Sequence, residues 1–195
     1  KSARMHQGIW DKSASGSYEV RGKKLGIIGY GNIGSQLSVI AESLGMKVLY
    51  YDREEKLALG NATKCKRLSD LLEQADIISM HVDGRVSNEN LIDEDAFAQM
   101  KDGVIFINLS RGHIVSIPAL RQAILNKKVA GCAIDVFPYE PVSNQETFES
   151  ELRGLPNTIL TPHIGGSTQE AQLAMGRAAI EGLETARVPE QGWPA

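Results

Sequence analysis

The sequence predicts an α/β fold, a doubly wound and mostly parallel sheet with helices on both faces. Two observations support this class. Short β-branched or apolar runs alternate with longer segments of helical periodicity, a pattern typical of βαβ units. The strand candidates are also apolar almost throughout, as expected for strands that are buried on both faces. The chain has 195 residues and neither repeat nor linker, so we expect one domain over residues 1–195.

Seven strands and five helices are expected. The predicted strands are 24–28, 47–51, 63–65, 77–81, 104–109, 129–134 and 158–160. The predicted helices are 32–45, 68–75, 93–100, 117–128 and 168–186. Ser116 before an Ile-Pro turn predicts an N-cap, and Ser167 with Glu170 three residues later fits a capping box. Residues 138–154 predict a long loop with at most one helical turn.

The composition excludes several function classes. A net charge of −3 gives no electrostatic reason to bind nucleic acid or an anionic membrane surface. Apolar runs stay short of the roughly 20 residues that span a bilayer. Cys65 and Cys132 have neither metal-ligand nor disulfide spacing, which predicts no metal and a reducing, cytoplasmic setting. The chain opens on Lys1 and loses helical periodicity over 186–195, so we expect a domain of a longer protein.

The segment GYGNIG, residues 29–34, predicts a dinucleotide-binding turn because it follows an apolar strand and opens a predicted helix. Gly29 is expected to make the tight turn and Gly31 to let backbone approach a pyrophosphate. Gly34 is expected to let the helix pack closely on the sheet. The pyrophosphate would then lie at the helix N-terminus, where free N–H groups and the helix dipole favour an anion.

Asp52 predicts which dinucleotide binds. It ends the second strand, 18 residues after Gly34, near the spacing of about 20 at which a carboxylate accepts from ribose hydroxyls. Such a carboxylate also repels a 2′-phosphate, so we predict NAD rather than NADP. Arg53 beside it could instead pair with that phosphate. Without the glycine motif, Asp52 would be interpreted as a cap of the next turn.

Polar side chains follow three later strands. VIFINL leads into Ser110 and Arg111, VAGCAI leads into Asp135 with Glu140 five residues later, and NTIL leads into His163. The carboxyl ends of parallel strands lie at one edge of a sheet. We therefore expect these residues at the same edge as GYGNIG.

Arg111, Glu140 and His163 together suit the oxidation of an alcohol. A hydride leaves a hydroxyl-bearing carbon only if the hydroxyl proton is removed, and histidine titrates closest to neutral pH. Glu140 would fix the tautomer of the ring, and Arg111 could hold a carboxylate with two hydrogen bonds. Each residue alone has an ordinary alternative as an exposed loop side chain or a cap. His81, at a strand end, could line the groove or be a hydrogen-bonded core residue.

These motifs resemble the D-isomer-specific 2-hydroxyacid dehydrogenases. GYGNIG with Asp52, SRG, AIDVFPYEP and TPHIGGSTQEA carry the resemblance, which covers nearly the whole chain. Within that family the sequences of these motifs are most similar to those of the bacterial branch that oxidises 3-phospho-D-glycerate with NAD in serine biosynthesis. The resemblance implies that Arg111, Glu140 and His163 are catalytic. His163 would be the general base in oxidation and the general acid in reduction.

The resemblance also implies a set of cofactor contacts. Asp135 matches the aspartate that binds the nicotinamide carboxamide, and the backbone after His163 would border the ring. The residues expected to contact NAD are Gly29, Gly31, Asn32, Ile33, Gly34, Asp52, His81, Val82, Leu109, Ser110, Arg111, Asp135, His163, Ile164, Gly165 and Gly166. The expected partners are NAD, a small 2-hydroxy acid, and further copies of the chain bound through this domain.

The sequence departs from the family at Asp83, where proline is usual, and at Ser116, where an acidic residue is common. We expect Asp83 to loosen the loop over the cofactor. The family's substrate-binding and regulatory regions are not expected in this chain. The opening segment ARMHQGIW, with Ile9 and Trp10, is expected either to contact another copy or to pack as a helix on its own domain.

Two other functions stay open from the sequence. One is another D-2-hydroxyacid dehydrogenase, such as a glyoxylate or hydroxypyruvate reductase, because no residue in the predicted set recognises a phosphate on the substrate. The other is an NAD-sensing interaction module like the co-repressors that resemble this fold and retain the same three polar residues.

Overall fold

The computed structural model describes residues 1–186, and residues 187–195 lie outside that part. Most of the terminal stretch expected to lose helical periodicity is therefore not described. In chain order the elements are α1 Ser2–His6, β1 Lys24–Ile28, α2 Asn32–Ser43, β2 Lys47–Tyr51, β3 Thr63–Lys64, α3 Leu68–Leu72, β4 Ile77–Met80, the 3₁₀ helix η1 Val86–Asn88, α4 Glu94–Gln99, β5 Val104–Asn108, the 3₁₀ helix η2 Gly112–Ile114, α5 Ile117–Leu125, β6 Val129–Ile134, β7 Thr158–Leu160 and α6 Gln169–Thr185.

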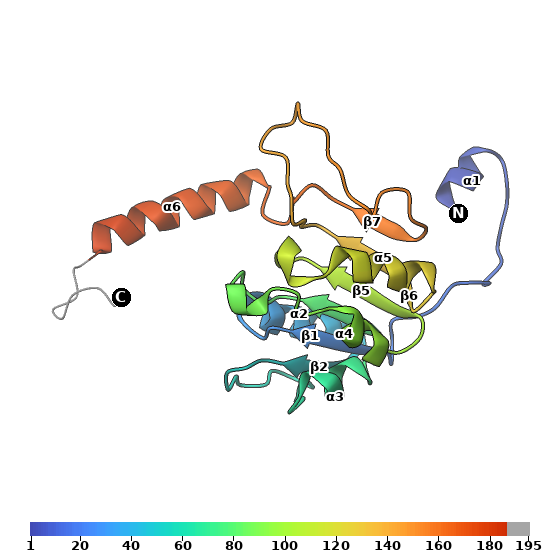
Figure 1. Ribbon diagram of the computed structural model, residues 1–195, viewed down its shortest axis with the longest axis horizontal. Coiled ribbons are helices and arrows are strands. Elements are labelled where there is room, and N and C mark those ends of the chain that lie inside the picture. The colour runs from blue at the N-terminus through green and yellow to red at the C-terminus, as the bar shows by residue number, and fades with distance from the viewer. Residues whose placement is uncertain (187–195) are drawn as a thin grey trace.

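The seven strands form one sheet in the order β3-β2-β1-β4-β5-β6-β7, and every neighbouring pair is parallel (Figure 1). The chain winds outward from β1 to β3, returns to the other side of β1 with β4, and winds outward again. The strand order therefore reverses between β1 and β4, the place where open α/β sheets bind ligands beyond the strand ends. The predicted fold class is confirmed.

The carboxyl ends of the strands are level with one another. Ile28 pairs with Tyr51 of β2 and with Met80 of β4. Asn108 of β5 pairs with Met80 on one side and with Ile134 of β6 on the other. Loops that are far apart in the sequence therefore meet at one edge of the sheet.

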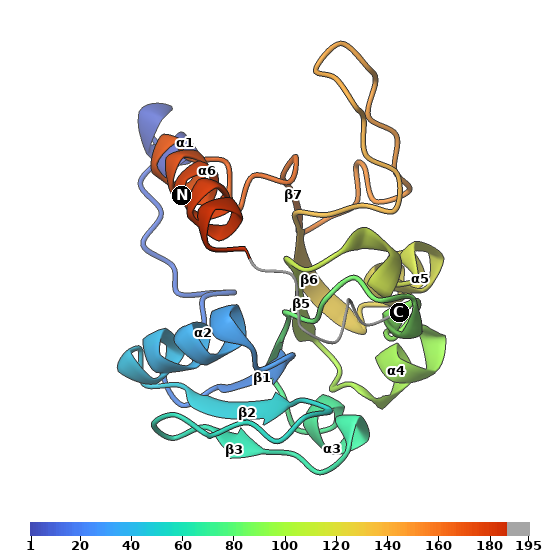
Figure 2. The same ribbon diagram turned by 90° about the vertical axis from the view of Figure 1, so that its left-hand side faces the viewer.

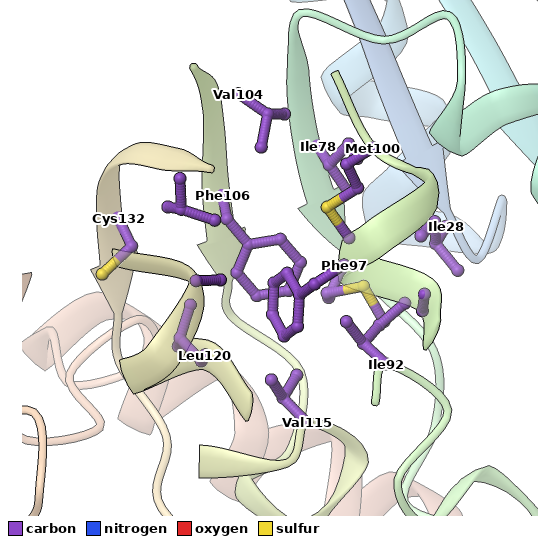
Figure 3. Close-up of a cluster of buried hydrophobic side chains, with 14 of the residues drawn as sticks. Ile28, Ile78, Ile92, Phe97, Met100, Val104, Phe106, Val115, Leu120 and Cys132 are labelled. Atoms are coloured by element: carbon purple, nitrogen blue, oxygen red, sulfur yellow. The ribbon is translucent and has the colours of Figure 1, made fainter. Parts of the chain in front are cut away.

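Helices cover both faces of the sheet. α3, α4 and α5 lie on one face over the larger core cluster, where Phe97 meets Phe106 edge to face with 5.3 Å between ring centroids (Figures 2 and 3). α2 lies on the other face over β1 and β2, where Tyr30 stacks on Tyr50 with 3.9 Å between centroids. Both tyrosines are buried. The Tyr30 hydroxyl lies 2.7 Å from Oγ of Ser38 in α2, so the helix is joined to this cluster and its N-terminus stays at the end of β1.

The two end helices carry no buried residue. α6 projects from the body of the domain and leaves Leu173, Met175, Ile180 and Leu183 more than half exposed. α1 is exposed throughout, so the alternative that the opening segment packs as a helix on its own domain is wrong. In residues 1–186 we find no helix with both the length and the apolar character to cross a membrane.

Element boundaries differ from the predictions by a few residues. The strands predicted at 63–65, 77–81 and 104–109 each end one residue early. Ser116 caps α5 as predicted, with its hydroxyl accepting from the N–H of Ala119. The capping box predicted at Ser167 is wrong. The N–H of Ser167 closes a turn on the carbonyl of Ile164, so α6 starts later and Thr168 is its N-cap.

The long loop predicted at 138–154 is present and contains turns but no helix. The ring of Phe148 packs edge to face against Phe137 with 4.6 Å between centroids, and Leu152 is fully buried. These apolar anchors hold the base of the loop, whereas Tyr139 is exposed. Glu140 therefore belongs to a loop whose base is fixed to the core.

Candidate active site

The turn after β1 has the geometry predicted for the glycine motif. Gly29 has a φ of +94°, and a Cβ on it would lie 2.6 Å from the carbonyl carbon of His81. A Cβ on Gly34 would lie 2.2 Å from the carbonyl oxygen of Gly29, so only glycine lets α2 come this close to β1. At Gly31 a Cβ would meet nothing within 4 Å. The space beside Gly31 is therefore open.

The N-terminus of α2 offers a place for an anion. Gly31 is the N-cap, and no side chain accepts from the first-turn N–H groups. Asn32 and Ile33 of that turn are exposed. Free N–H groups and the positive end of the helix dipole favour a phosphate. The open space at Gly31 and the uncapped helix end therefore fit the pyrophosphate of a dinucleotide.

Asp52, directly after β2, faces the same turn. Its Oδ2 accepts from the N–H of Tyr30 at 2.8 Å and its Oδ1 from the N–H of Glu54 at 2.9 Å. These bonds orient the carboxylate and leave it able to accept more, because each oxygen has two lone pairs. The groove beside it, with a volume of about 300 Å³, has Gly29, Gly31, Asp52, His81 and Val82 among its lining residues.

His81 is among the lining residues of this groove and is half buried. Its Nε2 lies 2.9 Å from Oγ of Ser79. Burial lowers the pKa of His81, which keeps the ring neutral near pH 7. The histidine therefore adds no charge to the groove.

At the end of β5, buried Asn108 organises the turn that carries Arg111. Its Oδ1 accepts from the N–H of Ser110 at 3.0 Å and from the Ser110 hydroxyl at 2.8 Å. Its Nδ2 donates to the carbonyl of Arg111 at 3.1 Å. Nη1 of Arg111 in turn donates to the carbonyl of Ser110 at 2.7 Å. Ser110 is thus buried inside the turn, whereas its neighbour Leu109 is half exposed.

Gly112 brings the Arg111 turn against the loop that carries Glu140. A Cβ on Gly112 would lie 1.9 Å from the carbonyl carbon of Phe137 and 2.3 Å from the nitrogen of Pro138. Any side chain here would push the two segments apart, because the space is filled by backbone. This close approach brings the ends of β5 and β6 into one site.

His163 and Glu140 form a hydrogen-bonded pair. Nδ1 of His163 lies 2.9 Å from Oε2 of Glu140, and Oε1 of Glu140 accepts from the N–H of Phe137 at 2.9 Å. Burial alone raises the pKa of Glu140, but both hydrogen bonds and the charges of His163 and Arg111 outweigh it and lower that pKa. Glu140 is therefore ionised near neutral pH and can only accept. Nδ1 of His163 must carry the hydrogen, which leaves Nε2 of the neutral ring as an acceptor.

The backbone of His163 is held in an uncommon conformation. Its φ is +54°, in the left-handed region that few residues other than glycine adopt. Its N–H donates to the carbonyl of Thr161 at 3.0 Å. Pro162 restricts the chain just before it, and Gly165 and Gly166 follow closely. A strained residue of this kind persists only where its surroundings fix it.

Asp135, at the end of β6, holds the loop of His163 in place. Its Oδ1 accepts from the hydroxyl of Thr161 at 2.5 Å and the N–H of Ile164 at 2.9 Å, and its Oδ2 from the N–H of Gly165 at 3.0 Å. Burial raises the pKa of Asp135, but these three donors outweigh it and lower that pKa. The structure thus gives Asp135 a positioning role, and its contact with nicotinamide stays a prediction.

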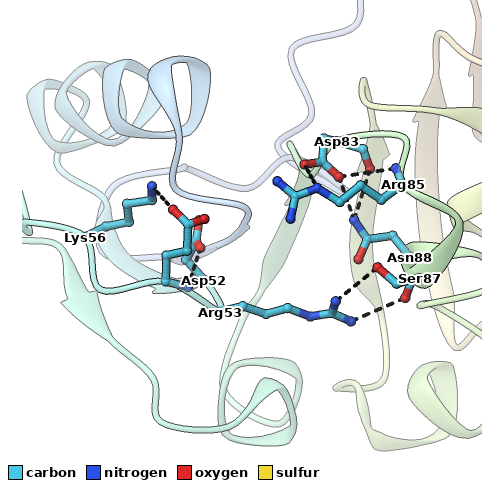
Figure 4. A network of polar contacts seen from close by, with 8 residues as sticks. Asp52, Arg53, Lys56, Asp83, Arg85, Ser87 and Asn88 are labelled. Atoms are coloured by element: carbon cyan, nitrogen blue, oxygen red, sulfur yellow. Dashed lines mark hydrogen bonds and ion pairs between the residues drawn. The ribbon is translucent and has the colours of Figure 1, made fainter. Parts of the chain in front are cut away.

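Asp83 tightens the loop after β4, which corrects the expectation that it loosens it (Figure 4). Its Oδ1 accepts from the N–H of Arg85 at 3.2 Å and from Nδ2 of Asn88 at 3.1 Å, and its Oδ2 pairs with Nε of Arg85 at 2.8 Å. Nδ2 of Asn88 also reaches the Asp83 carbonyl. Aspartate can organise a turn through such side-chain bonds. They restrain the loop where proline would restrain it by a fixed φ.

The predicted residues lie in two groups at the same edge of the sheet. One group surrounds the groove at the ends of β1, β2 and β4, and the other surrounds His163 at the ends of β5, β6 and β7. Two further residues, Asn108 and Thr161, were not among those predicted, and their side chains position the second group. The available signal was that each is a short polar residue within three positions of a predicted one.

Comparisons with known proteins find relatives over most of the chain. The model of the NAD binding domain of D-isomer specific 2-hydroxyacid dehydrogenases matches residues 1–165. Curated relatives include the D-3-phosphoglycerate dehydrogenases of Haemophilus influenzae and Escherichia coli strain K12, which are 58% and 55% identical over 175 residues. Each alignment covers 90% of this chain and 43% of the relative, so the chain spans less than half the length of these relatives.

A solved structure shares the fold of this chain. The D-lactate dehydrogenase from Aquifex aeolicus, complexed with NAD and lactic acid, matches with a TM-score of 0.81 at 28% identity, covering 94% of this chain and 59% of that chain. The matching family model describes an NAD-binding domain, so the predicted cofactor, NAD, is confirmed. The chain belongs to the D-isomer-specific 2-hydroxyacid dehydrogenase family, as an NAD-binding domain of that family.

Proposed function

We propose that the complete protein is an NAD-dependent D-3-phosphoglycerate dehydrogenase, which oxidises 3-phospho-D-glycerate to 3-phosphohydroxypyruvate in serine biosynthesis. One observation carries this proposal. The His163–Glu140 pair lies with Arg111 at the sheet edge where the glycine turn also opens. The relatives named D-3-phosphoglycerate dehydrogenase favour this substrate over other 2-hydroxy acids.

His163 and Glu140 are proposed to move the proton. When NAD is bound, its nicotinamide accepts the hydride from the carbon that carries the hydroxyl group. Nε2 of His163 takes the hydroxyl proton as general base, and returns it in the reverse direction. Glu140 holds the ring in the required tautomer and stabilises the imidazolium that forms.

Arg111 is proposed to bind the carboxylate of the substrate. Within residues 1–186 its guanidinium makes one hydrogen bond, to the carbonyl of Ser110, although it carries five N–H donors. Two of the others can form a bidentate pair with a carboxylate. Such a pair would hold the neighbouring hydroxyl group at His163, and this positioning supplies part of the rate enhancement.

The individual cofactor contacts and the domain organisation are also proposals. Asn32 and Ile33 would contact the pyrophosphate, Asp52 the ribose, and Asp135 with the backbone after His163 the nicotinamide. We propose that residues 1–195 form a single dinucleotide-binding domain. The substrate phosphate would be bound by a part of the protein outside this chain, because the residues of this site offer no contact dedicated to it.

A substrate panel on the complete protein tests the proposal. Values of kcat/KM would be measured with NAD or NADH for 3-phospho-D-glycerate, 3-phosphohydroxypyruvate, glyoxylate, hydroxypyruvate and D-lactate. The proposal predicts the highest values for the two phosphorylated compounds. Preference for glyoxylate or hydroxypyruvate would replace it with another D-2-hydroxyacid dehydrogenase. Absence of all turnover, with NAD-dependent self-association, would replace it with an interaction module.

We further propose that the protein forms a homo-oligomer through this domain. Trp10 is 76% exposed, and Ile40 on α2 and Leu44, its C-cap, are each more than half exposed. A contact between copies of the chain would bury these apolar side chains, which favours association. Sedimentation should show a dimer or a larger species, and Trp10→Ala should shift it toward the monomer. A monomeric wild-type protein would contradict this proposal.

We propose a reducing, cytoplasmic setting, because both cysteines are free thiols. Cys65 and Cys132 are free and buried. Burial raises the pKa of each thiol, which lowers the fraction of reactive thiolate. Thiol titration of protein purified without reductant should recover both groups in denaturant, whereas stable oxidation of either would argue against this setting.

A further inference from the structure

Three cationic side chains line the groove beside Asp52, and two of them have carboxylate partners. Lys56 pairs with Glu54 at 2.5 Å, and Arg85 pairs with Asp83 at 2.8 Å. Arg53 differs, because among residues 1–186 no carboxylate forms an ion pair with it. Of the three, Arg53 is the cation whose charge is left available for an anion.

The side chain of Arg53 extends to the loop after β4 (Figure 4). Nη1 donates to Oγ of Ser87 and Nη2 to the carbonyl of Ser87, both at 3.3 Å. Arg53 follows β2 and Ser87 lies in η1, so the bridge joins two sides of the groove. Both distances are long for N–H···O bonds, so the bridge restrains the guanidinium but a stronger acceptor could displace it.

The position of Arg53 next to Asp52 makes this restraint relevant to cofactor selection. It directly follows Asp52, whose carboxylate is oriented at the glycine turn by the N–H of Tyr30. In folds of this class, a carboxylate at that place selects NAD, whereas an arginine nearby accommodates the 2′-phosphate of NADP. The chain therefore carries both chemistries on successive residues. Which one dominates depends on what the guanidinium can reach.

The loop that supplies Ser87 is itself held in place. Asn88, the next residue, is buried, and its Nδ2 donates to the carbonyl and to Oδ1 of Asp83 at 3.1 Å each. Arg85 binds the same carboxylate through its side chain and its N–H. Ser87 is thus an exposed residue on a restrained turn, which makes it a fixed acceptor for Arg53.

We propose that Ser87 is a positioning residue for cofactor selectivity. By holding Arg53 across the groove, Ser87 keeps the guanidinium away from the ribose 2′ position and leaves Asp52 to discriminate against NADP. The inference rests on the cofactor-binding part of the proposed function and is independent of the substrate. Ser87 acts through Arg53 and takes no part in the reaction.

The test is the ratio of the dissociation constants of NADPH and NADH, measured by titration calorimetry on the complete protein. Ser87→Ala removes the hydroxyl and leaves one long bond to the carbonyl. We expect NADPH to bind about three- to fivefold more tightly, the range of an exposed ion pair, and NADH to change less than about twofold. Ser87→Thr keeps a hydroxyl group and should keep the wild-type ratio. Ser87→Gly, which also lacks the hydroxyl, replaces Ser87→Ala if that variant does not fold.

Second variants in the Ser87→Ala background identify the cation. Arg53→Gln should abolish the gain in NADPH affinity, whereas Arg85→Gln should preserve it, because only Arg53 is released. The gain should also shrink as salt rises. An unchanged ratio in Ser87→Ala, or a gain that survives Arg53→Gln, would overturn the inference. A wild-type protein that binds no NADH would contradict the proposed function instead, so the two failures are distinguishable.

Discussion

Gly112 packs so closely on Phe137 that a Cβ on the glycine would lie 1.9 Å from the carbonyl carbon of the phenylalanine. The contact joins the turn that carries Arg111 to the loop that carries Glu140. Because those residues come from different strands of the sheet, their meeting depends on this approach of two backbone segments. The hydrogen bond from Phe137 to Glu140 lies directly beside it.

Gly112→Ala is expected to destabilise the protein by about 2 kcal/mol or more, because backbone rather than a flexible side chain fills the space. Urea unfolding followed by circular dichroism measures the change. Gly166→Ala is the matched control, since a Cβ there would meet nothing within 4 Å and should change stability by less than about 0.5 kcal/mol. Equal effects of the two substitutions would show that the close approach is not required.

Glu140→Gln should lower kcat of the complete protein by about 10²- to 10⁴-fold, the range of one positioned acid–base group. The amide no longer obliges Nδ1 of His163 to carry the hydrogen, and it stabilises no imidazolium. The Kd of NADH should stay near the wild-type value. Glu146→Gln, in the same loop, should leave kcat unchanged. If Glu140→Gln retains wild-type turnover, the carboxylate has no part in the proton transfer.

The effect of substituting His163 on the unfolding free energy should reflect its left-handed backbone conformation. Asparagine tolerates φ near +54°, whereas alanine there costs about 1–2 kcal/mol. Both His163→Asn and His163→Ala lose the bond to Glu140, so the difference between their unfolding free energies isolates the backbone. We expect His163→Ala to be less stable by about 1 kcal/mol in urea unfolding. Equal stability would mean that the loop relaxes to another conformation.

Stability should fall in acid partly through Asp135. The folded pKa of this carboxyl lies below that of the unfolded chain, about 3.9, because its three hydrogen bonds outweigh burial. Its contribution to stability is therefore fully present above that value and is lost as the pH falls through the folded pKa. Between about pH 5 and 3, wild-type protein should lose more unfolding free energy than Asp135→Asn does. Parallel losses would contradict this role.

The fold could be predicted from the sequence because its signals are local. Apolar strand runs and helical periodicity placed every strand of the sheet to within one residue at each end. Local signals failed where a tertiary contact or turn decided the outcome. Ser167 has the composition of a cap, but its N–H closes a turn on Ile164, and the cap moves to Thr168. Periodicity also could not predict that α1 is exposed, because exposure depends on whether the helix packs against the rest of the domain.

The site could be predicted as far as strand ends determine it. His163, Glu140 and Arg111 follow parallel strands, so topology alone brings them to one edge. The longer-range positioning contacts could not be predicted, because each joins polar side chains far apart in the chain. Thr161 with Asp135, and Arg53 with Ser87, follow no repeat or motif. Aspartate in place of proline predicts a looser loop, because the sequence does not show that Arg85 and Asn88 donate to its side chain.

Turnover of His163→Asn in the complete protein tests the central claim most directly, because asparagine keeps the backbone conformation and removes the base. With 3-phospho-D-glycerate and NAD, kcat should fall by about 10²-fold or more, while the Kd of NADH stays within about threefold of wild type, or less than about 1 kcal/mol. Turnover near the wild-type value would contradict the assignment of His163 as the general base.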